Sequence, residues 1–148
     1  YSYVMNNYWH TNYRADQEGP VKFRYSLRPH AEFDAAEAQR FGIERSQPLV
    51  VVRCRADAPE LESVLQVEPD DVLVSSVRPV DDGAALLVRL HNPTDRVQPA
   101  GIRYLASPGA RLYRCTPRGA RLEPVPGAIP VAPGGIVTLR LELSTGPR

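Results

Sequence analysis

VLVSSVRPVDDGAALLVRLHNPTD, residues 72–95, contains the pattern of apolar runs and turns that recurs over residues 48–148. Two apolar runs, residues 72–77 and 84–90, are separated by Asp81-Asp82-Gly83, and an Asp-Gly pair between apolar runs is typical of a β-hairpin turn. Asn92-Pro93-Thr94-Asp95 is a second turn, directly after the second run. The stretch therefore predicts two antiparallel strands that continue into further β-structure.

Similar apolar runs follow one another over the last two thirds of the chain, with Pro and Gly between them. Short strands spaced by about eight to twelve residues are typical of an antiparallel β-sandwich. We therefore predict an all-β fold, an immunoglobulin-like antiparallel sandwich over residues 48–148. Its other predicted strands are residues 49–54, read as a central strand or one that crosses between domains, and residues 64–67, 97–105 with an interruption at Pro99, 112–116, 121–125 and 136–143.

Residues 1–47 have a different character and are predicted to form a separate part of the chain. Apolar and polar residues alternate strictly over residues 21–28, which predicts a strand with one face on a core. Asp34-Ala35-Ala36-Glu37 has the spacing of a capping box and predicts a short helix over about residues 34–41. Gly42 is expected to end this helix in a left-handed conformation.

Charge and cysteine content narrow the class of protein. The net charge is +1, and all but one of the 18 basic residues are scattered Arg, so we predict neither a nucleic-acid nor a membrane partner. No apolar run reaches the roughly 20 residues that span a bilayer. Cys54 and Cys115 lie far apart, which favours two free thiols in a reduced cytoplasmic protein. Because the chain starts at Tyr1 without a leader, we interpret it as part of a longer polypeptide.

Residues 3–13, YVMNNYWHTNY, combine the only Trp and the only Met with three Asn and several Tyr. Amide groups donate and accept hydrogen bonds, and aromatic rings offer a flat apolar face. This combination suits a sugar ring, and it also suits a protein interface, where Tyr and Trp are frequent anchors. A third interpretation is a buried aromatic corner in which Asn side chains hold a turn. The residue types alone leave all three open.

Asn6-Asn7-Tyr8-Trp9-His10-Thr11-Asn12, together with Gln17-Glu18-Gly19-Pro20 and Phe23-Arg24-Tyr25-Ser26-Leu27, resembles the C-terminal part of bacterial family 38 glycoside hydrolases, the α-mannosidases. Residues 72–79, 87–94 and 133–141 resemble later segments of that family in the same order. The resemblance implies that residues 1–47, with their helix, are the end of a large mutarotase-like central β-sandwich. It implies that residues 48–148 are the small C-terminal sandwich.

No catalytic or metal-binding set is predicted in this chain. His10, His30 and His91 lack the paired spacing of zinc ligands, and the adjacent pairs Asp70-Asp71 and Asp81-Asp82 lie on turns where carboxylates stay solvated. The resemblance implies a retaining, zinc-dependent mechanism whose metal and carboxylates belong to an N-terminal catalytic barrel. The chain alone is therefore expected to be inactive and without a cofactor, with that barrel and α-mannoside glycans as its partners.

Two places are predicted to reach a sugar or the barrel. Tyr8 or Trp9 is placed to stack on a hexose, while Asn6, Asn7 or Asn12 hydrogen-bonds its hydroxyls. Arg89 is expected on the strand face opposite to its Val and Leu neighbours, either solvated or paired with a barrel carboxylate. His91 departs from the aromatic residue of the family pattern. The alternative function is a self-sufficient carbohydrate-binding or adhesion module. The candidate substrate-binding residues are Asn6, Asn7, Tyr8, Trp9, Asn12 and Arg89.

Overall fold

The computed structural model describes Val4, Asn12 and residues 18–47, 49–57, 63–80, 83–105 and 109–143. The chain divides into two compact units, Tyr1–Ala31 and Glu32–Arg148. In the first unit, the described residues form neither helix nor strand and are exposed to solvent. All regular secondary structure of the described residues belongs to the second unit, which holds one helix and a β-sandwich.

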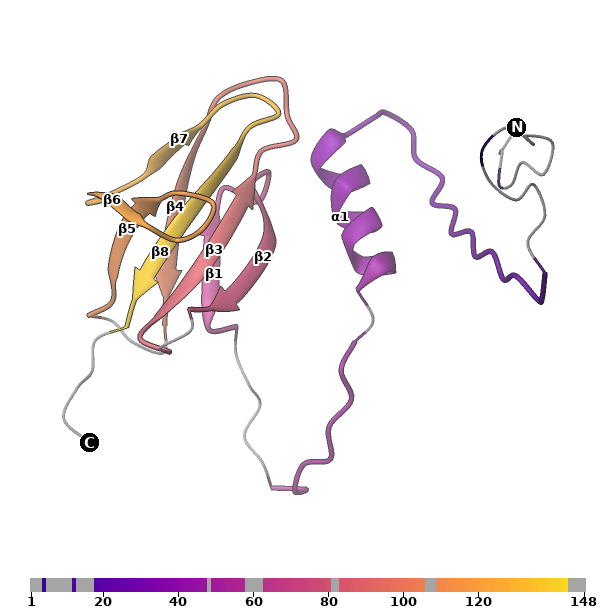
Figure 1. Cartoon of the computed structure of the whole chain (residues 1–148). Helices are drawn as coiled ribbons and strands as arrows, with labels where there is room; N and C mark the ends of the chain where they lie inside the picture. Colours follow the sequence, from indigo (N-terminus) through magenta and orange to yellow (C-terminus); the bar gives the residue numbers. More distant parts are fainter. Residues whose placement is uncertain are drawn as a thin grey trace. The chain divides into compact units, whose positions relative to one another are not determined.

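The strand predicted over residues 21–28 is absent from the structure (Figure 1). Its apolar side chains are exposed, from 41% for Val21 to 90% for Leu27. A strand is stabilised by a hydrogen-bonded neighbour, and an isolated one is not stable in water. None of the described residues pairs with this segment as a strand. The alternating pattern alone therefore does not produce a strand among the described residues.

Helix α1 (Ala35–Ser46) begins where the capping residues predict. Asp34 has an extended backbone, and its Oδ1 accepts a hydrogen bond of 2.8 Å from the N–H of Glu37. The predicted end at Gly42 is wrong, because the helix continues to Ser46. Gly42 keeps a helical backbone rather than a positive φ, at a cost of about 1 kcal/mol relative to Ala. No helix of the described residues, α1 included, is long and apolar enough to cross a membrane.

The sandwich consists of two antiparallel sheets (Figure 1). One sheet has the order β1-β4-β7 and the other has the order β2-β3-β8-β5-β6. The all-β antiparallel sandwich with a short helix is therefore confirmed. Its strands in the described residues are β1 (Leu65–Glu68), β2 (Leu73–Pro79), β3 (Ala85–His91), β4 (Gln98–Tyr104), β5 (Arg111–Cys115), β6 (Arg121–Pro124), β7 (Ile129–Val131) and β8 (Ile136–Glu142).

Three details of the strand prediction are wrong. β7 was not predicted, and β4 is not interrupted at Pro99, because that residue faces Pro130 of β7 where neither offers an N–H. Residues 49–54 form no strand. Leu49, Val50 and Val51 are 94%, 87% and 92% exposed, so this apolar segment lies outside the core of the sandwich.

The core lies between the sheets and is built from alternate residues of each strand. On β3 and β8, the pairs Val88–Leu139 and Leu90–Val137 face inward on the same side of the sheet. Leu90, Val88 and Leu139 have no exposed surface. The buried cluster consists of Val72, Val88, Leu90, Ala100, Ile129, Val131 and Leu139.

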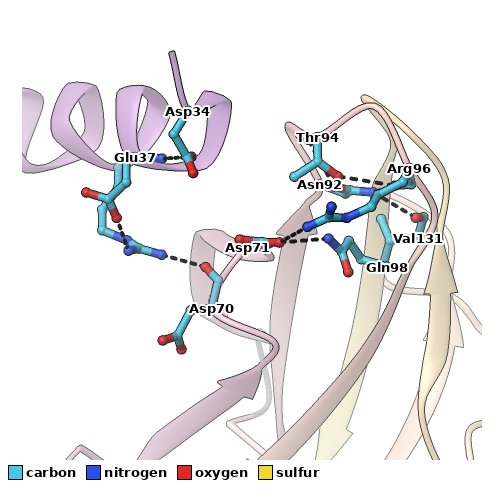
Figure 2. A network of polar contacts seen from close by, with 10 residues as sticks. Asp34, Glu37, Asp70, Asp71, Asn92, Thr94, Arg96, Gln98 and Val131 are labelled. Atoms are coloured by element: carbon cyan, nitrogen blue, oxygen red, sulfur yellow. Dashed lines mark hydrogen bonds and ion pairs between the residues drawn. The ribbon is translucent and has the colours of Figure 1, made fainter. Parts of the chain in front are cut away.

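Asn92 holds two loops together at one end of the sandwich (Figure 2). Its side chain is fully buried, and its amide nitrogen donates to the carbonyl oxygens of Arg96 at 2.7 Å and Val131 at 3.0 Å. Its Oδ1 accepts from the backbone N–H of Thr94 at 3.0 Å and from the Thr94 hydroxyl at 2.7 Å. The Asn-Pro-Thr turn predicted from the sequence thus joins the β3–β4 loop to the end of β7.

A carboxylate extends this network to a third loop. Oδ2 of Asp71, just before β2, accepts hydrogen bonds of 2.9 Å from both Arg96 and Gln98 (Figure 2). The neighbouring Asp70 uses its carbonyl oxygen to accept a hydrogen bond from Arg40 of α1. Asp71 of this predicted turn pair therefore has a structural role, whereas the sequence predicted only that its carboxylate stays solvated.

Candidate functional site

Arg89 is the candidate site residue that the structure places on a sheet, in the centre of β3. Because Val88 and Leu90 point into the core, the side chain of Arg89 projects from the opposite, outer face of the five-stranded sheet, as predicted. Across the strands, Arg89 pairs with Ser76 of β2 and with Thr138 of β8. The half-buried guanidinium therefore lies in a row with two hydroxyl groups.

Two further Arg residues occupy the adjacent row of the same face. Arg78 of β2 and Arg140 of β8 both pair with Leu87, two residues before Arg89 on β3. Neighbouring strands lie about 4.8 Å apart, so these side chains are diagonal neighbours of Arg89. We call Ser76, Arg78, Arg89, Thr138 and Arg140 the arginine face.

The three guanidinium groups differ in their hydrogen-bond and ion-pair partners. Arg140 Nε donates to Glu142 Oε1 at 3.2 Å, and Glu142 also pairs with Arg121 at 3.4 Å. Arg78 Nη2 reaches the carbonyl oxygen of Pro117 at 3.5 Å. The Arg89 side chain makes no hydrogen bond or ion pair with any other described residue. Within the described part of the chain, the face therefore carries more positive than negative charge.

The turn between β5 and β6 covers part of this face. Gly119 is buried with a positive φ of 92°, and a Cβ added there would lie 2.9 Å from the side chain of Leu87. The turn is closed by a 2.8 Å hydrogen bond from the N–H of Gly119 to the carbonyl oxygen of Thr116. Glycine is required here because a side chain would be strained and would displace Leu87.

Cys115 lies where β5 enters this turn, and its thiol is buried. Burial raises the pKa of the Cys115 thiol above its ordinary value of 9.0, while Arg140, Arg78 and Arg89 act in the opposite direction. Three guanidinium groups on three different strands therefore act on the same buried atom. Cys54 is also free but exposed, and it lies outside any strand.

We predict that iodoacetamide will distinguish the two cysteines. In the native chain, Cys54 should be alkylated on the order of 100-fold faster than Cys115, because the Cys115 thiol is both covered and held protonated. The raised pKa of Cys115 also stabilises the native fold below pH 9.0, and this contribution is lost as the pH rises through the native pKa. Peptide mass spectrometry after timed alkylation measures both rates. Equal rates in the native chain would contradict the burial of Cys115.

The other predicted site residues are placed as follows. Asn6, Asn7, Tyr8 and Trp9 lie outside the described residues, and Asn12 is exposed in a bend of the first unit. Among the described residues, no group of three or more His, Cys, Asp or Glu side chains could hold a metal ion. Arg78 and Arg140 were not predicted as members of the face, because the strand register that aligns them with Leu87 cannot be read from local sequence.

Comparison of this chain with protein families, with curated proteins and with solved structures gave no significant match.

Proposed function

We propose that this chain is a non-catalytic C-terminal segment of a retaining, metal-dependent α-mannosidase of glycoside hydrolase family 38. In this proposal it scaffolds a catalytic barrel and lines the sugar pocket with Asn6, Asn7, Tyr8, Trp9 and Asn12. The proposal rests on the family resemblance of residues 6–12, 17–20 and 23–27 and on one structural observation: the apolar side chains of two segments, residues 49–52 and residues 21–28, are exposed.

The stronger of the two segments is residues 49–52. Four consecutive apolar side chains are between 74% and 94% exposed. Burying one such side chain contributes about 1.5–3 kcal/mol, so covering all four is worth on the order of 6–12 kcal/mol. A β-branched run of this kind left in water also invites aggregation. Such a segment favours a chain that is completed by another body over a self-contained module.

The second segment supports the same interpretation. Val21, Phe23, Tyr25 and Leu27 alternate with polar residues, and they remain 41–90% exposed. Period-two alternation is the pattern of a strand that is buried on one face. In the proposed enzyme, this strand is the last of the large central sandwich, and the rest of that sheet supplies its neighbour.

The proposal assigns catalysis to the barrel and a structural role to this chain, in line with the chemistry of retaining glycosidases. That mechanism uses two carboxyl groups about 5–5.5 Å apart on either side of the scissile bond. Within the described residues, Asp71 is held by Arg96 and Gln98, and Glu142 is held by Arg121 and Arg140. Both carboxylates thus form hydrogen bonds and ion pairs that stabilise the fold. In the proposal, the nucleophile, the general acid and the zinc ion come from the barrel, as the family resemblance implies.

We predict that a charge placed in the apolar segment will have opposite effects in two contexts. Val51→Lys should increase the soluble yield of the isolated chain, because it interrupts an exposed apolar run. In the complete enzyme, the same change should lower the melting temperature by roughly 4–8 °C, as expected for a loss of 2–3 kcal/mol in a large protein. Val97→Lys is the matched control, since Val97 is 56% exposed at a single position in the β3–β4 loop. A complete enzyme that tolerates both changes equally would contradict a covered segment.

A sugar titration separates the proposal from the alternative module. Trp9 is the only tryptophan, so its fluorescence reports on residues 3–13 without interference. The scaffold proposal predicts no saturable change when the isolated chain is titrated with methyl α-mannoside to concentrations of about 10 mM. A saturable change would favour the carbohydrate-binding module.

A further inference from the structure

We propose that the arginine face is a binding site for a carboxylate, which an acidic segment of a partner polypeptide presents to Arg89. The inference that a carboxylate binds here depends only on the residues of the arginine face. Only the identification of the partner as the catalytic body of the same enzyme rests on the proposed function.

First, the guanidinium of Arg89 has N–H donors that no described residue uses. A guanidinium carries five N–H donors in a planar fork, and it does not lose its charge in proteins. Arg89 is half-buried in the middle of a sheet, yet its side chain has no hydrogen-bond or ion-pair partner in the described part of the chain. A partly desolvated charge is costly unless it is paired. The position therefore favours an anion that arrives from outside.

The second step is the set of groups that surround this fork. Ser76 and Thr138 lie on either side of Arg89 in the register, and neither hydroxyl bonds to another described residue. A bulge in β2 between Val74 and Ser76 sets the position of Ser76, and the Ser75 hydroxyl holds the bulge by donating to the carbonyl oxygen of Arg89 at 3.1 Å. Bulges often re-aim side chains beside binding sites. Two hydroxyl donors thus flank one open fork.

Third, the number of open guanidinium groups favours a carboxylate over a phosphate. Of the three guanidinium groups, Arg140 is occupied by Glu142 and Arg78 reaches Pro117, which leaves one open fork rather than a cluster. One fork matches one planar carboxylate by two parallel hydrogen bonds. A phosphate dianion calls for more donors and more unpaired charge than the face offers. Arg78 and Arg140 supply a positive field that strengthens the attraction without competing for the same oxygens.

The fourth step is access. β2 is an edge strand of the five-stranded sheet (Figure 1), and Arg89 lies on the adjacent strand. The β5–β6 turn covers Leu87 on the same face. Helix α1 contacts β2 along part of this edge. An extended acidic segment can therefore approach Arg89 over the outer face of the sheet, beside the part of β2 that α1 leaves uncovered.

The experiment follows the Arg Nε–H signals of the isotope-labelled 148-residue chain by NMR. Sodium acetate, sodium phosphate and sodium chloride are titrated at equal ionic strength. We expect acetate to shift the Arg89 signal saturably, with a dissociation constant on the order of 10 mM, as befits one charge-assisted contact. Arg118, exposed in the β5–β6 turn, is the matched control and should shift only weakly and without saturation.

Two substitutions complete the test. Arg89→Gln should abolish the saturable response and leave the melting temperature of the isolated chain within about 2 °C of its original value. Arg89→Lys keeps the charge but not the fork, and it should weaken acetate binding roughly tenfold.

Three results would overturn the proposal: equal responses of Arg89 and Arg118, tighter binding of phosphate than of acetate, or a large loss of stability in Arg89→Gln. The proposed enzyme function is tested separately by mannoside hydrolysis. Failure of that function would leave acetate binding intact, and failure of acetate binding would leave the hydrolysis unaffected.

Discussion

Replacing Asn92 by Ala is expected to lower the free energy of unfolding of the chain by about 3–5 kcal/mol. The side chain is fully buried and satisfies carbonyl oxygens of Arg96 and Val131 together with the N–H and hydroxyl of Thr94. Each buried polar group left without a partner costs about 1–3 kcal/mol. The methyl group of Ala also leaves a cavity between two loops. Urea unfolding followed by circular dichroism measures the loss.

A graded control comes from the same network. Thr94→Val removes only the hydroxyl that donates to Asn92 Oδ1 at 2.7 Å and keeps the volume of the side chain. It should cost about 1 kcal/mol, the usual worth of a single hydrogen bond. A loss below about 1 kcal/mol for Asn92→Ala would show that the two loops are held by other contacts. The role assigned to the Asn-Pro-Thr turn would then be wrong.

Replacing Leu139 by Ala is expected to cost about 2–5 kcal/mol, the range for large-to-small changes in a packed core. Leu139 is fully buried on β8, where it pairs with Val88 of β3 and with Arg114 of β5. β8 lies between those two strands in the five-stranded sheet. The lost methyl groups therefore open a cavity where both halves of the sheet meet the core.

The matched control for Leu139 lies on an edge strand. Leu122 of β6 is 59% exposed, so Leu122→Ala should change the free energy of unfolding by less than about 0.5 kcal/mol. The comparison keeps the chemistry of the substitution and varies only burial. Similar costs for the two variants would contradict the packing of the sheets described above.

Features specified by neighbouring residues were predictable from sequence. The cap at Asp34 depends on an N–H three residues away, and the antiparallel pairing of β2 with β3 was predicted from the Asp-Gly pair in the sequence between them. The outward position of Arg89 followed from strand alternation alone. The end of α1 was not predictable, because Gly42 is compatible both with a helix interior and with a C-terminal cap.

Features specified by distant residues were not predictable. The neighbours of Arg89 follow from a bulge in β2 and from the register of β8, 49 residues further along the chain. β7 is three residues long and contains Pro130, so it reads as part of a turn. Residues 21–28 and 49–54 carry strand patterns whose pairing partners are absent from the described chain. An alternating or β-branched residue pattern indicates a preference for a strand, but the strand forms only where a neighbouring strand pairs with it.

The most direct test of the proposed function is a comparison of α-mannoside hydrolysis by two polypeptides, the 148-residue chain and the complete product of the gene that encodes it. Both are assayed with a chromogenic α-mannoside, with added zinc and after chelation. The proposal predicts that the complete product hydrolyses the substrate in a metal-dependent way, with retention of anomeric configuration, and that the 148-residue chain does not. A complete product that hydrolyses no α-mannoside, or a 148-residue chain that does so alone, would contradict it.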